Sequence, residues 1–368
     1  MDLFSNENSI YVFILFLIAV MLSTLINGLF VKFSNNLGMR NSQDGNEPII
    51  RWASTSKPAF GGISFFILFL FSFAVFAIFP SKDNVLINKV HLAVLLCSTI
   101  GFLIGLADDA YNTKPLLKFS GQLLCAIILL GAGIWIDISP SRIFNYIFTI
   151  FWVIGIMNSI NMLDNMDGVV SSISIVIILA ILSVCALSGI YEPFFFITGL
   201  GVVAALLGFL CFNWHPSKMY MGDTGSQFLG AFLSAMSILF IWNLRDIHGP
   251  QYQIRQFVAP MLIFIVPLID TTTVSIRRMM RGHSPFVGGR DHITHHLAMM
   301  GVKDYFVCMI YIFLSALSVG LFLFLHFNNY ETKYLNPIAI GFFMVLFIAI
   351  QLMYQKNAHR HDVKKDEV

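Results

Sequence analysis

The stretch NSINMLDNMDG, residues 158–168, places polar side chains at every third position between two apolar runs. These are Asn158, Asn161, Asp164 and Asp167. Carboxylate and amide oxygens are ligands that suit a hard cation such as Mg²⁺. Three residues turn an α-helix by about 300°, so the first three side chains fit one face and the fourth does not. We therefore expect the helix to end near Asn161 and Asp167 to begin the next helix, with an N-cap as its simplest role.

Two adjacent carboxylates, Asp108 and Asp109, follow another apolar run at 89–107. Such carboxylates repel each other unless a cation lies between them. Acids at a helix C-terminus also oppose the helix dipole, so a solvated helix end explains them poorly. We interpret them as metal ligands, or as a base beside an electrostatic partner. Lys118 is placed to meet a phosphate, whereas a membrane-surface anchor explains Lys114 equally well.

A third polar segment, MYMGDTGS at 219–226, precedes a further apolar run. Backbone N–H groups at a helix N-terminus form an anion site, and a carboxylate beside a bound phosphate needs a cation between them. Asp223 is therefore a candidate metal ligand, although a capped turn would use the same residue types. Tyr220 can stack on a base or anchor the chain at the membrane interface.

Three histidines, His292, His295 and His296, share one helical face through their i, i+3, i+4 spacing. Beside Arg290 they favour the binding of a phosphate or a sugar. A zinc site is a weaker alternative because neither a cysteine nor an HExxH pattern accompanies them. A solvated surface helix would explain them without any function. The five cysteines of the chain lie in or at the ends of apolar runs, which predicts no disulfide.

The elements that must position these groups are membrane helices. Of the 368 residues, 57% are hydrophobic and only 11% are charged, against about a quarter charged in soluble domains. The backbone must satisfy its own hydrogen bonds in lipid, so long apolar runs are helices. We expect an all-α polytopic protein with residues 1–355 as one integral domain, 356–368 as a basic tail, and a first span that is retained. The eleven predicted spans are 9–31, 61–80, 89–107, 119–136, 143–157, 169–189, 193–212, 225–243, 256–276, 305–326 and 335–354.

The Lys and Arg residues are distributed unevenly between the two sides of these spans. Most of them follow odd-numbered spans or lie in the tail, which predicts an N-terminus outside and a C-terminus in the cytoplasm. The polar segments then all face the cytoplasm at the membrane surface, where nucleotides and magnesium are found. The segments are 57–62, 108–118, 158–168, 213–226 and 281–297. A net charge of +2 gives no indication of a nucleic-acid partner.

Four motifs in one order on one face resemble the polyprenyl-phosphate N-acetylhexosamine-1-phosphate transferases, a bacterial family of the glycosyltransferase 4 type. They are DD at 108–109, N-x-x-N-x-x-D-x-x-D-G at 158–168, GDTGS at 222–226 and SPF…DHITHHL at 284–297. The span count and the SPF sequence are most similar to the branch that acts on UDP-N-acetylglucosamine and undecaprenyl phosphate. The chain departs from the family pattern in its H-x-x-H-H cluster and in Asn112, which stands where DDxxD has a third aspartate.

The resemblance implies transfer of HexNAc-1-phosphate, with GlcNAc as the default sugar, from a UDP-sugar to polyprenyl phosphate in the bacterial inner membrane. UMP leaves, and the product begins a cell-envelope polysaccharide such as lipopolysaccharide or a wall polymer. By similarity, Asn161 and Asp223 would hold Mg²⁺, with Mn²⁺ as an alternative. Asp167 and Tyr220 would hold the uridine. The sugar phosphate would be held by Arg290, His292, His295 and His296.

In the same family Asp108 is the usual candidate for a base that deprotonates the lipid phosphate. A phosphate monoester has a second pKa of about 6, so at pH 7 it is already mostly dianionic. We therefore assign Asp108, Asp109 and Lys118 to positioning the acceptor, and we expect direct attack without a covalent intermediate. We assign Asp164 to the surroundings of the metal and the phosphates. We assign Asn158 to packing or to hydrogen bonding at the helix end.

Other functions remain open at this point. A phospho-N-acetylmuramoyl-pentapeptide transferase is one alternative, although its branch usually has three consecutive histidines. A secondary transporter is an alternative from another class, because ionisable groups within spans can act as relays. Asp270, in the span 256–276, is the main residue that such a relay could use. A homodimer is compatible with all of these functions.

Overall fold

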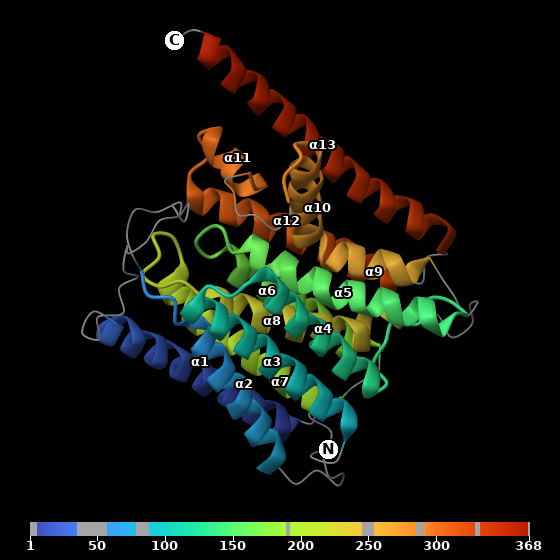
Figure 1. Ribbon diagram of the computed structural model, residues 1–368. Helices are drawn as coiled ribbons and strands as arrows, with labels where there is room; N and C mark the ends of the chain where they lie inside the picture. The colour runs from blue at the N-terminus through green and yellow to red at the C-terminus, as the bar shows by residue number, and fades with distance from the viewer. Residues whose placement is uncertain are drawn as a thin grey trace.

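The computed structural model describes residues 6–34, 57–78, 88–188, 192–244, 254–284, 289, 291–327 and 332–366, and over these residues it is all-helical. Most helices lie side by side in one bundle, from which α10, α11 and the end of α13 project (Figure 1). The elements are α1 (Asn6–Ser34), α2 (Gly61–Ile78), α3 (Lys89–Tyr111), α4 (Pro115–Gly131), α5 (Arg142–Leu163), α6 (Val169–Leu187), α7 (Pro193–Asn213), α8 (Gly222–Ser237), the π-helical turn η2 (Ile238–Trp242), α9 (Arg255–Ile263), α10 (Ile265–Met280), α11 (Ile293–Met299), α12 (Asp304–Phe327) and α13 (Thr332–Asp366).

Each of the predicted apolar runs coincides with a helix or with a bent pair of helices, which confirms the all-helical fold. Within the described residues, eight helices are long and apolar enough to cross a membrane, and the α9–α10 pair makes a ninth if it counts as one span. The helices α2 and α4 are apolar but shorter. The chain is therefore a multi-pass membrane protein, whereas the count of eleven spans and the orientation of the termini stay predictions.

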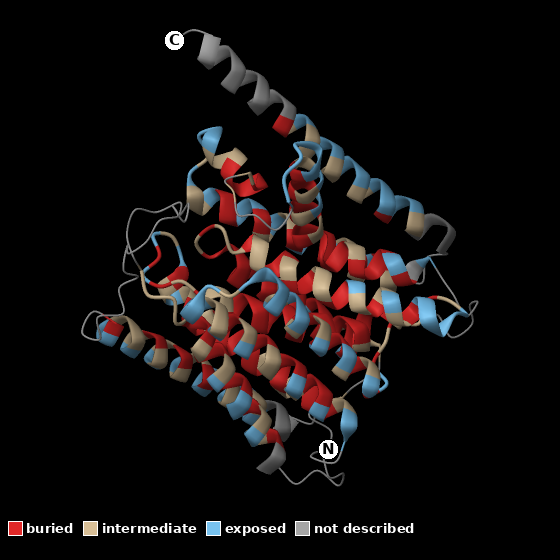
Figure 2. Ribbon diagram, viewed as in Figure 1, coloured by how far each residue is buried: buried red, intermediate tan, exposed pale blue. Residues whose placement is uncertain are grey.

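At the centre of the bundle lies α8, with α2, α3, α4, α5 and α6 packed around it. Every residue from Thr224 to Ser237 is buried. Buried residues concentrate in the middle of the bundle, whereas α1 and α13 carry many exposed ones (Figure 2). Exposed apolar side chains such as Phe13 and Val345 suit a surface that faces lipid. The helix that carries the MGDTGS motif is thus the most enclosed element of the fold.

The sequence GFLIG, residues 101–105, explains how closely α3 approaches α8. Two glycines one turn apart let the backbones of membrane helices touch. A Cβ at Gly105 would lie 2.1 Å from the Asp223 carbonyl oxygen, and one at Gly101 would lie 2.8 Å from the Gln227 carbonyl oxygen. This contact holds the end of α3, with its two adjacent carboxylates, against the first turn of α8.

We expect Gly105→Ala to lower both the melting temperature and the activity. The added methyl group would overlap backbone atoms of α8, and overpacking of this kind costs about 1–3 kcal/mol. Thermal denaturation of the purified protein in detergent measures the effect. Gly131→Ala is the control, because nothing lies within 4 Å of a Cβ built there. Equal melting temperatures for the two variants would contradict the close contact.

The run 256–276 was expected to form one span, but it is two helices. α9 and α10 meet at an angle of 84°, and Phe264 forms the junction between them. Pro267 explains the break, because proline has no N–H to donate and its ring clashes with the carbonyl group four residues earlier. The bend turns α10 away from the bundle (Figure 1) and carries Asp270 towards α11.

Candidate active site

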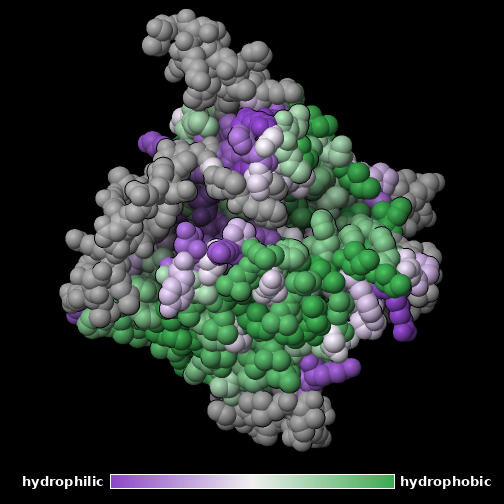
Figure 3. Space-filling view, viewed as in Figure 1, coloured by the Kyte–Doolittle hydropathy of each residue, from purple (hydrophilic) through white to green (hydrophobic). Residues whose placement is uncertain are grey.

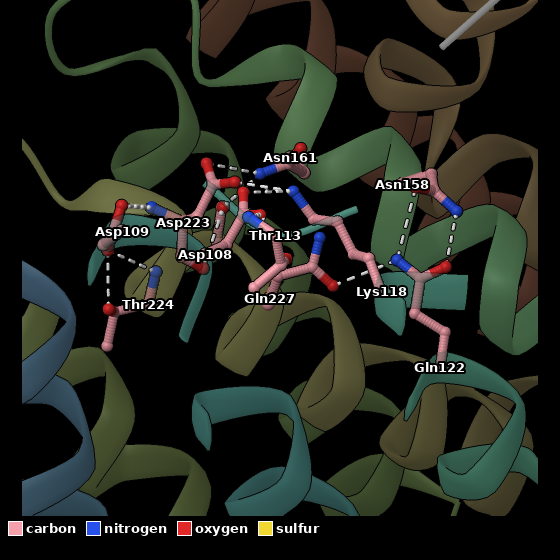
Figure 4. A network of polar contacts seen from close by, with 11 residues as sticks. Asp108, Asp109, Thr113, Lys118, Gln122, Asn158, Asn161, Asp223, Thr224 and Gln227 are labelled. Atoms are coloured by element: carbon pink, nitrogen blue, oxygen red, sulfur yellow. Dashed lines mark hydrogen bonds and ion pairs between the residues drawn. The ribbon is translucent and has the colours of Figure 1, made fainter. Parts of the chain in front are cut away.

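The ends of α3, α4, α5 and α8 bring four of the predicted site residues together (Figure 4). The Lys118 ammonium group donates to Asp108 Oδ2 at 2.9 Å and to Asp223 Oδ2 at 2.6 Å. The other oxygen of Asp223 accepts from Asn161 Nδ2 at 3.0 Å. A lysine between two carboxylates, with an amide beside them, is a charged centre that can meet phosphate groups and a cation.

The C-terminal end of α3 is built to hold Asp108. Asn112 takes the left-handed conformation with φ 47° and caps the helix, since its N–H donates to the Asp108 carbonyl oxygen at 2.8 Å. Asparagine is one of the few residues that adopts this conformation readily. The chain then turns back so that the Thr113 N–H and hydroxyl donate to Asp108 Oδ1 at 3.1 and 2.6 Å. This turn gives a structural reason for asparagine at position 112.

The carboxylate of Asp109 caps α8. Its Oδ1 accepts from the Asp223 N–H at 2.9 Å, and its Oδ2 accepts from the N–H and hydroxyl of Thr224 at 2.9 and 2.6 Å. Gly222 has φ 73°, and a Cβ there would lie 2.5 Å from Asp109 Oδ2. The anion site that we expected at this helix N-terminus thus holds a side chain of the protein itself. These contacts favour a positioning role for Asp109, whereas the predicted role beside the acceptor stays a prediction.

The region around Asp164 carries a surplus of negative charge. Burial, together with the nearby carboxylates of Asp223, Asp109 and Asp167, raises the pKa of Asp164 to about 8. Lys118 is the cation that contacts two of the carboxylates in this part of the site. A divalent cation would offset the remaining charge.

Asn158 is half-buried and belongs to a separate row of hydrogen-bonded amides, with the buried Gln122 and Gln227, beside the charged centre (Figure 4). Its Nδ2 donates to Gln122 Oε1 at 2.9 Å and to the Ile154 carbonyl oxygen at 2.9 Å. Gln122 Nε2 donates in turn to Asn158 Oδ1 and to Gln227 Oε1 at 3.2 and 3.1 Å. This side chain therefore joins α5 to α4 and α8, as the sequence predicts for a packing residue.

The variants Asn158→Ala and Asn161→Ala should separate packing from metal binding. Asn158→Ala leaves buried amide groups unpaired, so we expect a loss of about 1–3 kcal/mol in stability with an unchanged Mg²⁺ requirement. Asn161→Ala should instead raise the Mg²⁺ concentration for half-maximal activity by about 10-fold or more. Mg²⁺ titrations and melting curves of both variants provide the test. Equal Mg²⁺ shifts in the two variants would contradict this division.

The sequence predicted Asp167 as the N-cap of α6, but its carboxylate does not cap this helix. The N-cap is Gly168, whose N–H donates to Asn213 Oδ1 at 3.0 Å. Asp167 instead accepts from the Ser217 hydroxyl and N–H at 2.7 and 3.0 Å and lies 3.2 Å from His215 Nδ1. Its carboxylate therefore ties the turn after α5 to the segment before α8.

Lys57 is a member of this second cluster that the sequence did not single out. Its ammonium group lies 3.9 Å from Asp167 Oδ2 and donates to the Ser217 hydroxyl at 2.9 Å. It also lies 5.1 Å from the centre of the Tyr220 ring. In the sequence, only its position at the start of the polar segment KPAFGG indicated a role for Lys57. In the structure, the N–H groups of Gly61 and Gly62 donate to the carbonyl oxygens of residues 220 and 221, which pairs this segment with MYMG.

The turn between α5 and α6 connects all these groups. α5 continues to Leu163, two residues beyond the expected end near Asn161, and Asp164 is its C-cap. Asn165 Oδ1 accepts from the Thr294 hydroxyl at 2.5 Å, which links the turn to α11. The stretch 158–168 therefore contacts α8, the segment before α8, and α11, which we call the histidine helix because His292, His295 and His296 lie in it or at its start.

Two of the three histidines are buried beside α10. His292 Nδ1 lies 2.7 Å from Asp270 Oδ2, and the ring centres of His292 and His295 are 5.7 Å apart. Arg290 lies outside the described residues. In the part of the chain that the structure describes, no three His, Cys, Asp or Glu side chains form a group that could hold a metal ion.

His296 has a different environment, since it packs against the last helix. The ring centres of His296 and Tyr354 are 3.9 Å apart, and the Tyr354 hydroxyl donates to the Asp291 carbonyl oxygen at 2.6 Å. Burial and the nearby Arg277 guanidinium lower the pKa of His296 to about 4. The imidazole is therefore neutral at pH 7 and can interact with a sugar phosphate only as a neutral group.

The polar groups collect at one side of the molecule. Hydrophilic residues gather around the region of α10 and α11 and line a recess beside it, whereas hydrophobic residues cover the body of the bundle (Figure 3). The polar contacts of four helix ends thus gather in one region rather than being spread through the apolar interior (Figure 4).

Comparisons with known proteins agree with this arrangement. The pattern of glycosyl transferase family 4 matches residues 91–241. A probable undecaprenyl-phosphate N-acetylglucosaminyl 1-phosphate transferase of Bacillus subtilis is 28% identical over 220 residues, covering 57% of this chain and 59% of that protein. The match thus spans less than two thirds of the length of the Bacillus relative.

Two further relatives match over longer stretches. A decaprenyl-phosphate N-acetylglucosaminephosphotransferase of Mycobacterium tuberculosis is 26% identical over 305 residues, which is 76% of this chain and 74% of that protein. A phospho-N-acetylmuramoyl-pentapeptide-transferase of Streptococcus pyogenes is 28% identical over 318 residues, which is 78% of this chain and 88% of that protein. The region 91–241 contains the charged centre and Asp167 but not the histidine helix.

Proposed function

We propose that the chain belongs to glycosyl transferase family 4, whose pattern matches residues 91–241, and that it transfers N-acetylhexosamine-1-phosphate from a UDP-sugar to polyprenyl phosphate, with UMP as the second product. GlcNAc-1-phosphate is the group we expect, because the relatives in Bacillus and Mycobacterium are named for it. The observation that carries the proposal is the ion cluster of Lys118, Asp108 and Asp223 at the ends of apolar helices. It suits a reaction between a soluble nucleotide sugar and a phosphate that stays in the membrane.

The proposed setting is the bacterial inner membrane with the site on its cytoplasmic face. Eleven spans follow from the apolar runs of the sequence, and an external N-terminus and a cytoplasmic C-terminus follow from the distribution of Lys and Arg. The gathering of the polar segments at one end of the bundle supports this topology. The bulk of the donor would then reach the site from the cytoplasm, while the prenyl chain of the acceptor stays among the helices and lipid.

The residues present fit a magnesium ion. Mg²⁺ usually takes one or two protein carboxylates and completes its coordination with substrate phosphates and water. We assign the protein ligands to Asp223 and Asn161, whose side chains are already in contact at 3.0 Å. Asp164 lies near Asp223, and its pKa is raised first by burial and then by the carboxylates of Asp223, Asp109 and Asp167. When bound, the ion would neutralise charge that develops on the leaving UMP.

The other side chains hold the two substrates. Lys118 would bind the acceptor phosphate, and Asp108, fixed by Thr113, would hold the ammonium group in place. The acceptor phosphate is already mostly dianionic at pH 7, so we expect it to attack the donor directly. Trapping of a phosphorylated or UMP-labelled protein from UDP-sugar alone would argue for a covalent intermediate instead.

The uridine would lie in the cluster of Asp167, Tyr220 and Lys57. Tyr220 offers an aromatic face, and the carboxylate of Asp167 is held in place by Ser217. A carboxylate can accept about four hydrogen bonds, so Asp167 has capacity left for a donor group of the ligand. The sugar phosphate would then face the histidine helix.

Release of radiolabelled UMP from membranes that contain the protein tests the proposal. We expect release that depends on both Mg²⁺ and polyprenyl phosphate, and a panel of UDP-sugars that includes UDP-GlcNAc and UDP-MurNAc-pentapeptide identifies the donor. Preference for the pentapeptide donor would assign the protein to the branch of the Streptococcus relative. No release with any UDP-sugar would refute the proposed function and leave the transporter alternative.

A further inference from the structure

Asp270 is a fully buried carboxylate that the proposed chemistry has not used. It lies on α10, directly after the bend, and has 0% of its surface exposed. A buried charge is costly unless it is paired and hydrogen-bonded. Both of its oxygens are used, because Oδ2 contacts His292 Nδ1 at 2.7 Å and Oδ1 accepts from the Ile293 N–H at 3.0 Å.

The two contacts fix one short piece of chain. His292 has an extended backbone with φ −74° and ψ 157°, and its own side chain makes no capping hydrogen bond to α11. The Asp270 carboxylate takes the first N–H of that helix while it holds the imidazole ring of the residue before it. The orientation of this ring is therefore set from a different helix rather than by local sequence.

The neighbouring acid is already engaged elsewhere. Asp291 accepts from Arg278 Nε at 2.8 Å and Nη2 at 2.6 Å in a two-pronged ion pair. Although burial favours its neutral form, this pair holds the pKa of Asp291 below its ordinary value. Asp270 is thus the carboxylate that hydrogen-bonds to the His292 ring, and Asp291 anchors the segment to the end of α10.

A carboxylate at Nδ1 decides which nitrogen of a histidine is available. Nδ1 must carry a proton to donate to Asp270, so Nε2 on the other side of the ring is left for a ligand. The same device orients histidines that bind metals or take part in catalysis, where loss of the outer partner typically costs about 10–100-fold. Here the histidine belongs to the segment assigned to the sugar phosphate.

We propose that Asp270 is a positioning residue that fixes the tautomer and orientation of His292, so that Nε2 is presented to the sugar phosphate of the donor. This inference rests on the proposed function. It gives Asp270 a role other than that of a transport relay, because the carboxylate contacts a histidine ring and a backbone N–H. It also assigns a purpose to the bend at Phe264, which brings α10 to the histidine helix.

The test combines kinetics with a direct view of the ring. Asp270→Asn keeps the shape of the side chain, but its NH₂ group would face Nδ1 and favour the opposite tautomer. We expect kcat/KM for the UDP-sugar to fall by about 10–100-fold. In the His292→Asn background, the same change should cause no further loss. Asp137→Asn is the matched control, because that carboxylate pairs with Asn145 at the opposite end of the bundle.

Nitrogen-15 NMR of histidine-labelled protein reports which ring nitrogen of His292 carries the proton. A purely structural role of Asp270 would not require a change in this tautomer. His292 should have a protonated Nδ1 in the wild type and a protonated Nε2 with a bare Nδ1 in Asp270→Asn; the signal is assigned through its loss in His292→Asn. A wild-type ring protonated only at Nε2 would overturn the proposal, as would a full additional loss in the double variant. Absence of UMP release by the wild type would instead refute the proposed function, while the NMR result would still decide the tautomer.

Discussion

Asp223→Asn should abolish most UMP release, with a fall of at least about 10²–10³-fold at every Mg²⁺ concentration. The substitution removes the carboxylate that contacts both Lys118 and Asn161 and that we assign to the metal. Folding should be retained, because the N-terminus of α8 is capped by Asp109 through backbone N–H groups that the change leaves intact. Initial rates of UMP release in membranes, measured over an Mg²⁺ titration, provide the measurement.

The matched control for this prediction is a carboxylate far from the charged centre. Asp137→Asn makes the same chemical change at the other end of α4 and α5, and its activity should equal that of the wild type. Expression and melting temperature of both variants show that protein is present and folded. If Asp223→Asn kept most of the wild-type rate, Asp223 would not be a ligand of the catalytic metal.

Lys118→Met should lower activity by about 10²-fold or more. It should raise the KM for polyprenyl phosphate by a larger factor than the KM for the UDP-sugar. Removal of the ammonium group leaves Asp108 and Asp223 facing each other without a cation. Solvent screens this part-buried group, so the loss of stability should be smaller than the roughly 3–5 kcal/mol of a fully buried ion pair. The substitution also removes the group that we expect to meet the incoming phosphate. Steady-state kinetics with each substrate varied in turn separate the two KM values.

Lys114→Met is the control, since that exposed lysine lies one turn before Lys118 at the start of α4. It should change activity little. Lys118→Arg should restore only part of the rate, because a planar guanidinium does not match a compact ammonium between two carboxylates. If only the KM for the UDP-sugar rises in Lys118→Met, Lys118 binds the donor rather than the acceptor.

The helical framework was predictable because the solvent dictates it. A chain in lipid must form its backbone hydrogen bonds internally, so a long apolar run predicts a helix. The predicted span 193–212, for example, differs by one residue from α7, Pro193–Asn213. Hydropathy, however, does not register a bend. Pro267 was visible in the sequence, but whether a proline kinks a membrane helix or breaks it by 84° depends on its neighbours.

The candidate site was predictable in its residue types and only partly in its contacts. Asp223, Lys118 and Asn161 come together as their spacing and the family resemblance implied. The capping of α8 by Asp109 joins residues 114 positions apart, and no local pattern indicates it. Asp270 and His292 are also brought together by a bend that the hydropathy profile does not contain.

The end of α8 that Asp109 closes has a consequence for inhibition. Many proteins attract phosphate to a free helix N-terminus, and such an end would also attract inorganic phosphate, ATP and other soluble anions. Here the N–H groups of Asp223 and Thr224, in the first turn of α8, already donate to the internal carboxylate of Asp109. These N–H groups are therefore not available to an anion that binds without a cation. We expect the site to prefer anions that bind together with a cation.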